Sequence, residues 1–315
     1  MSSHEPASIA PRATPWPPAN APAAPTGPPS PLRRLRLLLD MIKFEHTVFA
    51  LPFALLAMFL AAEGMPPLGT IVWILAAMVG ARSTAMAMNR IADTNLDAEN
   101  PRTAGRHLPA GLVRRSEAWL FALGSAVLFL VAAWRLNRLA LALAPVALAV
   151  IWSYSWTKRF TWGSHLWLGL SLALAPLGAW IAVRGRLDAL PLVLGAGVVF
   201  WVAGFDTIYS CQDADFDRRR GLFSLPARFG TRGALAVARG FHVLMLACFS
   251  VLGILFHFGW LYALGLCVVA ALVVLQHALV RASDLRHIDI AFFNVNSMVG
   301  VLLAAFALAD RFLLR

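Results

Sequence analysis

Long apolar runs separated by short polar segments make up most of this chain. Each run is close to the length of about 20 residues that a helix needs to cross the hydrocarbon layer of a membrane. The runs lie at about residues 46–62, 68–90, 117–134, 138–156, 164–183, 190–211, 234–256, 259–280 and 289–313. This pattern predicts an all-α integral membrane protein with about nine transmembrane helices.

The first residues differ from the rest in composition. Residues 1–31 hold about half of the 19 prolines, mixed with alanine, serine and threonine. A segment of this composition cannot bury enough apolar surface to fold on its own. We therefore predict a disordered cytoplasmic tail over residues 1–31 and a nine-helix transmembrane domain over residues 32–315. An amphipathic segment, Leu37–Glu45, leads into the first apolar run.

The overall composition supports a membrane protein. The chain is 59% apolar and 14% charged, whereas soluble domains are about 45–50% apolar and about 25% charged. A net charge of +11 could indicate a nucleic-acid partner. However, the basic residues lie in short loops between apolar runs, and not together on one soluble face. We therefore expect the lipid bilayer, and no nucleic acid, as a partner.

Basic residues in the loops also orient the predicted bundle. Every second connection is rich in arginine, and the positive-inside rule places such loops in the cytoplasm. They include two long polar loops, at about residues 91–116 and 212–233. We expect these loops and the N-terminus on the cytoplasmic side of a bacterial inner membrane, in a chain that crosses it many times.

Two aspartate-containing stripes carry the candidate chemistry. In each, a polar residue and two aspartates recur at every fourth position; the first is Asn89, Asp93 and Asp97, and the second is Tyr209, Asp213 and Asp217. Residues four apart share one face of a helix. Carboxylates crowded in this way repel one another unless a cation lies between them. Mg²⁺ prefers oxygen ligands and is often shared with substrate phosphates, so the stripes predict a magnesium–diphosphate site.

Basic residues accompany both stripes and suit the binding of phosphate. Arg102 and Arg106 follow the first stripe, Lys158 lies at the same predicted membrane face, and Lys43 approaches from the first helix. Acids and bases gathered at one face are typical of a polyphosphate site. Four histidines show no ligand spacing and are predicted to be isolated and either structural or interfacial: His165, His242, His257 and His277.

These motifs resemble the UbiA superfamily of intramembrane prenyltransferases, which carries NxxxDxxxD and a later DxxxD. The segment Asp97–Pro109 is similar to the D-x-x-N-P-R-T-x-x-R-P-L-P loop of that family. Asp206–Tyr209 and Lys158–Thr161 are similar to the D-T-x-Y and K-R-Y-T segments of 4-hydroxybenzoate polyprenyltransferases. The resemblance implies nine helices forming a UbiA-type bundle around a central cavity.

The resemblance also implies an activity, the Mg²⁺-dependent transfer of a polyprenyl group from polyprenyl diphosphate to an aromatic acceptor in quinone biosynthesis. By position, the residues that would hold Mg²⁺ and the diphosphate are Asn89, Asp93, Asp97, Asp213 and Asp217. The residues that would contact the diphosphate or shield the developing cation are Lys43, Arg102, Arg106, Lys158 and Tyr209. As a separate hypothesis about the mechanism, Asp206 or Asp215 accepts a proton or orients the acceptor.

The acceptor stays open between 4-hydroxybenzoate and 1,4-dihydroxy-6-naphthoate. Ile42–Thr47 departs from the R-L-D-K-P of ubiquinone-pathway members, and Gly204–Gly230 looks closer to a sister group in the futalosine route to menaquinone. Other branches of the superfamily, which make haem O, chlorophyll or tocopherol precursors, share the same motifs. A secondary transporter is a further alternative, although its sites should lie near the middle of the membrane.

Overall fold

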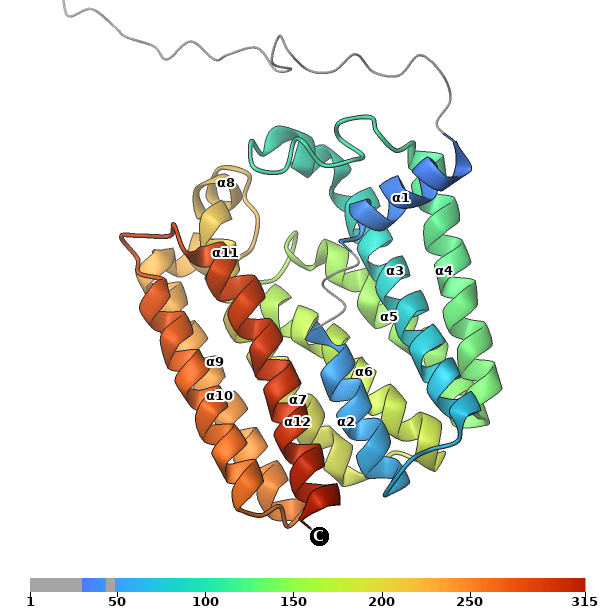
Figure 1. The fold of residues 1–315 in the computed structure, drawn as a ribbon. Helices are drawn as coiled ribbons and strands as arrows, with labels where there is room; N and C mark the ends of the chain where they lie inside the picture. Colours follow the sequence, from blue (N-terminus) through green and yellow to red (C-terminus); the bar gives the residue numbers. More distant parts are fainter. Residues whose placement is uncertain (1–29, 44–48, 315) are drawn as a thin grey trace, which may run out of the picture.

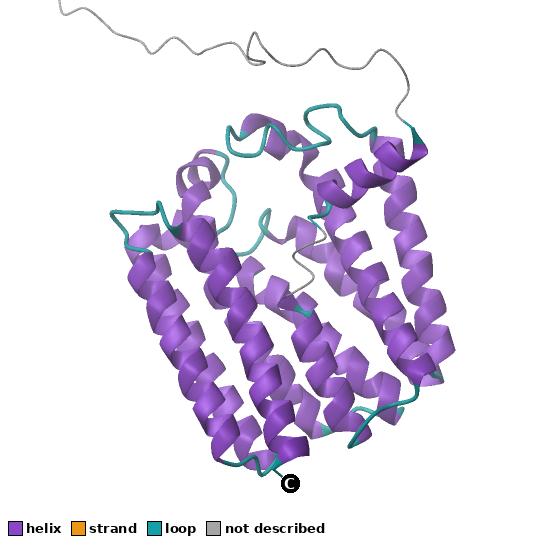
Figure 2. Cartoon of the chain, in the orientation of Figure 1, coloured by secondary structure: helices purple, strands orange, loops and turns teal. Residues whose placement is uncertain are grey.

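The computed structural model describes residues 30–43 and 49–314 of the 315-residue chain. Within this part of the chain the secondary structure is helical, apart from one isolated bridge between Arg281 and Asp284. The long helices pack side by side in one bundle (Figures 1 and 2). The all-α prediction is thus confirmed. The predicted disordered tail, residues 1–31, lies outside the described residues except for Ser30 and Pro31, which cap and begin a helix.

Eight helices in the described residues are long and apolar enough to cross a membrane. They are α3 (Leu68–Glu99), α4 (Arg115–Leu136), α5 (Arg138–Thr157), α6 (Ser164–Arg184), α7 (Ala189–Ser210) with its extension to Arg219, α9 (Leu225–Leu255), α10 (Trp260–Leu279) and α12 (Asn296–Leu313) with the turns that precede it from Ile288. A shorter apolar helix, α2 (Leu51–Ala62), corresponds to the first predicted run. With α2, these helices account for the nine predicted runs.

Neighbouring helices contact each other closely at glycines, which carry no side chain. A Cβ atom built on Gly80 of α3 would lie 2.7 Å from the backbone nitrogen of Phe129 in α4. One built on Gly169 of α6 would lie 2.4 Å from the backbone oxygen of Val199 in α7. Small residues of this kind let two backbones approach closely, which is how helices associate in lipid. Gly80 thus lets α3 pack closely on α4, and Gly169 lets α6 pack closely on α7.

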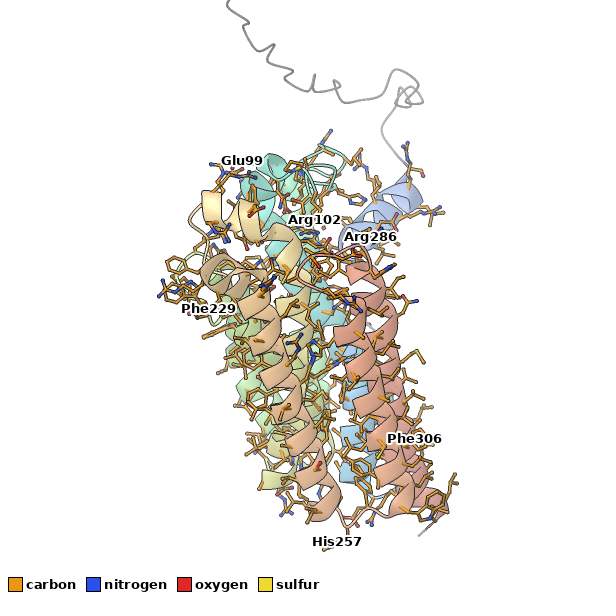
Figure 3. The ribbon with its side chains drawn as sticks, turned by 90° about the vertical axis from the view of Figure 1, so that its left-hand side faces the viewer. Glu99, Arg102, Phe229, His257, Arg286 and Phe306 are labelled. Carbon is orange, nitrogen blue, oxygen red and sulfur yellow. The ribbon has the colours of Figure 1, made fainter. Side chains whose placement is uncertain are left out.

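The end of α3 extends past the predicted apolar run. Its 32 residues span about 48 Å at about 1.5 Å per residue, whereas the hydrocarbon layer is about 30 Å thick. The helix therefore projects beyond the layer at one end, and the first aspartate stripe lies on this projecting part. Glu99 and Arg102 lie at this end of the bundle, and His257 lies at the other (Figure 3).

The second stripe departs from the prediction of one continuous helix. After α7 comes a 3-10 turn, η2 (Cys211–Asp213), and then a short helix, α8 (Ala214–Arg219). Aspartates disfavour helix interiors but stabilise a helix N-terminus, and arginines stabilise its C-terminus. Asp215 and Asp217 occupy the first turn of α8, and Arg218 and Arg219 occupy its last turn. The charge order of the segment thus favours a new helix over continuation of α7.

Other boundaries also differ. The amphipathic segment is the helix α1 (Pro31–Met41), which begins six residues before the predicted Leu37 because Ser30 caps it by accepting a hydrogen bond from the Arg33 N–H. It lies across the same end of the bundle as α8 (Figure 1).

The prediction that the histidines are isolated is wrong for one pair, since His242 Nδ1 on α9 lies 2.9 Å from His277 Nε2 on α10.

Candidate active site

A polar cavity of about 160 Å³ lies among the ends of α3, α5 and α7 and the loops beside them. It gathers ten of the twelve residues predicted from the sequence: Asn89, Asp93, Asp97, Arg102, Arg106, Lys158, Asp206, Tyr209, Asp213 and Asp217. A larger cavity of about 540 Å³ between α1 and α4 is lined mainly by apolar side chains. Charge, and not size, therefore marks the polar cavity as the candidate active site.

The first stripe is held on one continuous face of α3. Asn89 Nδ2 donates to Asp93 Oδ2 at 2.9 Å, so neighbouring members of the stripe contact each other as the spacing predicts. Arg159 Nη2, at the end of α5, donates to Asp93 Oδ1 at 3.0 Å. Arg106 Nη1 donates to both oxygens of Asp97, at 2.7 and 2.9 Å. The stripe thus faces arginines from two separate connections.

The second stripe is tied to the loop that follows the first. Asn100 Nδ2 donates to Asp213 Oδ1 at 3.0 Å, and Arg102 Nε donates to the same oxygen at 2.9 Å. Arg102 Nη2 also donates to Asp213 Oδ2, which makes the pair bidentate. Lys158 Nζ lies 3.9 Å from Asp217 Oδ2. Residues more than 100 positions apart in the chain are therefore held in one network.

The electrostatics follow a simple pattern, in which each stripe aspartate faces a basic residue of its own. Burial alone would lower the pKa of Lys158, but the carboxylates of Asp217, Asp206 and Asp213 outweigh it and raise that pKa above its usual range. Burial likewise opposes the charge of Arg102, and its hydrogen bonds and attraction to Asp213 raise its pKa. Both side chains therefore stay cationic at neutral pH.

The raised pKa of Lys158 leads to a prediction for ligand binding. A raised pKa keeps the charge, and its contribution, at every pH below the usual value of about 10.4. The ratio of diphosphate affinities between the wild-type protein and Lys158→Met should therefore stay constant from about pH 7 to about pH 9. Calorimetric titrations at several pH values measure this ratio. A ratio that falls toward 1 across this interval would show that Lys158 is already losing its proton.

Two predicted residues are not among those that line the cavity. Asp215 is 85% exposed and pairs with Arg218 at 3.0 Å, so it faces away from the other aspartates. Lys43 is exposed, and its backbone oxygen accepts a hydrogen bond from Arg82 Nη2 at 3.3 Å. Lys43 is the last described residue before the gap, and the divergent segment that follows it, residues 44–47, lies outside the described residues.

Several residues that complete the site are not among those predicted from the sequence. Arg159 and Asn100 both lie within the motif segments, next to predicted residues. Arg90 is buried on α3, where Nε donates to the backbone oxygen of Met41 at 3.3 Å and Nη1 donates to Asn89 Oδ1 at 3.2 Å. His165 contacts Asp206 at 2.7 Å. The sequence signal for Arg90 is its position, since this arginine lies at the end of an apolar run and directly follows the stripe residue Asn89.

The donor set suits a magnesium ion that is shared with a phosphate ligand. In the described residues no group of three His, Cys, Asp or Glu side chains forms a metal site by itself. The carboxylates are instead spread around the cavity, and Asp217 Oδ2 is buried without a hydrogen-bond partner among the described residues. Mg²⁺ typically takes one or two carboxylates, several waters and substrate phosphates, not a closed protein cage. The residues present therefore fit Mg²⁺.

Comparison with known proteins supports the resemblance to the UbiA family. The family model described as the UbiA prenyltransferase family matches residues 50–298. The chain is 31% identical over 258 residues to a 4-hydroxybenzoate octaprenyltransferase of Nitrosomonas europaea, covering 80% of this chain and 86% of that one. It is 29% identical over 279 residues to the Burkholderia mallei protein of the same name, covering 88% and 97%.

Solved structures agree. The apo structure of a UbiA homologue from Aeropyrum pernix K1 superposes with a TM-score of 0.77 at 35% identity, covering 84% of this chain and 98% of that one. A UbiA homologue from Archaeoglobus fulgidus bound to DMAPP and Mg²⁺ has a TM-score of 0.64 at 19% identity, covering 88% and 98%, and shows a shared fold. The predicted UbiA-type bundle is thus confirmed. The chain belongs to the UbiA prenyltransferase family and is a multi-pass membrane prenyltransferase.

Proposed function

We propose that this protein transfers a polyprenyl group from polyprenyl diphosphate to an aromatic acceptor in quinone biosynthesis, with Mg²⁺ as cofactor. The observation that carries the proposal is the cavity in which each of four aspartates faces its own basic residue. The relatives named 4-hydroxybenzoate octaprenyltransferase support an aromatic acceptor. The homologue bound to DMAPP and Mg²⁺ supports a prenyl diphosphate and a divalent cation.

The residue roles follow from the contacts. Asn89, Asp93, Asp97, Asp213 and Asp217 would hold Mg²⁺, which, when bound, neutralises negative charge on the departing diphosphate. Arg102, Arg106 and Lys158 would bind phosphate oxygens, and Arg159 joins them because it lies against Asp93. The ion pairs keep both sets of side chains in place, so the substrate meets a preorganised site. Lys43 stays a predicted contact at the edge of the described residues.

Tyr209 lies where the polar cavity meets an aromatic cluster. The guanidinium of Arg102 lies 5.5 Å from the centre of the Tyr209 ring, and the Phe292 ring lies 4.2 Å from it. Phe292 in turn packs on Phe205 and Phe49, at 5.4 and 5.6 Å. Aromatic faces stabilise cations, and apolar walls exclude water. These rings would therefore shield the allylic cation that forms when the C–O bond breaks.

Orientation and localisation are part of the proposal. The arginine-rich loops lie at the same end of the bundle as α1 (Figures 1 and 3), and residues of these loops line the cavity. The positive-inside rule supports a cytoplasmic position for this end and the active site, and the bacterial relatives support a bacterial inner membrane. A secondary transporter is disfavoured, because the carboxylates lie at one end of the bundle and not at its middle.

A prenyl-transfer assay tests the function and the acceptor together. Protein in lipid vesicles receives Mg²⁺, labelled farnesyl diphosphate and one acceptor at a time, either 4-hydroxybenzoate or 1,4-dihydroxy-6-naphthoate. Prenylation of one acceptor supports the proposal and assigns the pathway. Prenylation of neither acceptor, but of a haem, chlorophyll or tocopherol precursor, would replace it with another branch of the family.

Removal of the metal should abolish turnover. We expect excess chelator to stop product formation and added Mg²⁺ to restore it, because the diphosphate would leave with uncompensated charge. Prenyl diphosphate should also raise the melting temperature of the protein when Mg²⁺ is present and much less when it is absent. Full activity in chelator, with metal-free protein verified by elemental analysis, would contradict the magnesium assignment.

A further inference from the structure

Asp206 lines the cavity but belongs to neither aspartate stripe. It lies on α7 one turn before Tyr209, and its side chain is 15% exposed. Since α7 runs toward the cavity and ends at Ser210, Asp206 lies about 6 Å deeper along the helix axis than this end, at about 1.5 Å per residue. This depth is below the aspartates of the second stripe, where the charged head of a prenyl diphosphate would join its apolar chain.

A buried histidine holds one oxygen of this carboxylate. His165, in the first turn of α6, has Nδ1 2.7 Å from Asp206 Oδ2. Its Nε2 accepts a hydrogen bond from the backbone N–H of Leu225 at 3.4 Å. A backbone amide can only donate, so Nε2 acts as the acceptor and Nδ1 as the donor. His165 therefore donates through Nδ1 to Asp206 Oδ2.

A histidine ring as hydrogen-bond partner distinguishes Asp206 from the stripe aspartates. Arginine or lysine faces each carboxylate of the two stripes. A neighbouring cation favours the ionised carboxylate and opposes the uptake of a proton. Lys158 and Tyr154, both on the α5 side, also interact with Asp206, and three more aspartates share the charge of Lys158.

We propose that Asp206 is the catalytic base that removes the aromatic proton of the acceptor, and that His165 is the residue that positions it. This inference rests on the proposed prenyl transfer and adds its last step. The allylic C–O bond breaks, and its electron pair leaves with the diphosphate. The ring carbon ortho to the acceptor hydroxyl then forms a C–C bond to the allylic carbon. The C–H electrons return to the ring as the proton moves to Asp206 Oδ1 and on to water.

The structure also favours Asp206 over the other candidate proton acceptor. Asp215 is 85% exposed and binds Arg218 at 3.0 Å, outside the cavity lining. A general base must come within hydrogen-bond reach of the proton that it takes. Of these two carboxylates, only Asp206 borders the space in which the acceptor would lie.

The main test compares full-length wild-type protein with Asp206→Asn in lipid with Mg²⁺. The substrates are farnesyl diphosphate that carries a heavy oxygen isotope in its bridging position, and an acceptor deuterated at the reacting ring carbon. We expect kcat to fall about 10²–10⁴-fold, as for loss of a general base, with little change in KM for the diphosphate. Scrambling of the oxygen isotope should continue, because ionisation does not need the base, and deuterium should slow the variant more than the wild type.

His165 is tested by two substitutions. His165→Leu removes the donor, and His165→Asn keeps an N–H in the position of Nδ1. In the Leu variant the acidic limb of the kcat–pH profile should move to higher pH, because the ionised carboxylate has lost a hydrogen bond. The Asn variant should restore the profile. An unchanged profile in the Leu variant, with only lower thermal stability, would reduce His165 to a packing residue.

The controls separate this inference from the proposed function. Asp284→Asn makes the same chemical change in the loop after α10, where Asp284 binds Arg286 at 2.7 Å, and should leave kcat unchanged. A wild-type rate in Asp206→Asn would overturn the base assignment alone. Loss of isotope scrambling together with product would place Asp206 in the diphosphate site, and so also overturn it. A wild-type protein that prenylates no aromatic acceptor would overturn the prenyl transfer itself.

Discussion

Replacing Asp93 or Asp213 by asparagine is expected to lower kcat at least about 100-fold, because each carboxylate stabilises charge at the reacting diphosphate. The substitution preserves the size of the side chain and removes one negative charge. The asparagine keeps one acceptor oxygen, so Asp93→Asn can still accept from Asn89 or Arg159, and Asp213→Asn can still accept from Asn100 and Arg102 Nε at one oxygen. The loss should therefore appear in catalysis, with the helical bundle still folded.

Single-turnover rates at saturating Mg²⁺ and farnesyl diphosphate measure this effect, and circular dichroism in detergent verifies the fold. Asp188→Asn is a matched control, because Asp188 accepts a hydrogen bond from Trp180 Nε1 at 2.9 Å, at the start of α7 and away from the cavity. Near-normal turnover in either Asp93→Asn or Asp213→Asn would exclude that aspartate from the metal set.

Substitution of Arg102 is expected to have the second large effect on catalysis. It binds both oxygens of Asp213 and donates to Tyr209 Oη at 3.3 Å, so it links the loop after α3 to the end of α7. Arg102→Ala should reduce kcat/KM for the prenyl diphosphate at least about 100-fold, by removal of a bidentate cation and of the contact that positions Asp213. Arg102→Lys should recover only part of this loss, because an ammonium cannot make the same two parallel contacts.

A double-mutant cycle between Arg102→Ala and Asp213→Asn measures how far the two residues act as one unit. Residues in direct contact show non-additive effects, so the double variant should lose much less than the two single losses combined. Independent, additive losses would mean that the pair separates before the rate-limiting step. Arg218→Ala is the control, since Arg218 binds the exposed Asp215 and should leave kcat/KM unchanged.

The sequence predicted most of the fold because the physics that fixes it is local. A run of about 20 apolar residues becomes a helix in lipid, since a helix satisfies all backbone hydrogen bonds within the one segment. The stripe on α3 was predictable for the same reason, because Asn89, Asp93 and Asp97 follow helical spacing and the helix is continuous. The break at η2 is also a local effect, and the order of charges in α8 could have indicated it.

The pairing within the site was not predictable in this way. Arg102 and Asp213 are separated by 111 positions, and His165 and Asp206 by 41. Helical spacing gives the face on which a residue lies but not which helix that face meets. Asp206 and Asp215 were equivalent candidates in the sequence, and packing at the start of α6 separates them, since His165 approaches only Asp206.

The length of α3 has a consequence for what happens after turnover. The helix places its carboxylates beyond the hydrocarbon layer, while the aromatic cluster below Tyr209 lies deeper in the bundle. On the proposed function, the two products would form on opposite sides of this boundary. Diphosphate would diffuse into water, and the prenylated ring would remain with the lipids. The enzyme would thus sort its products by solubility at the moment of their formation, and the reverse reaction would lack one partner.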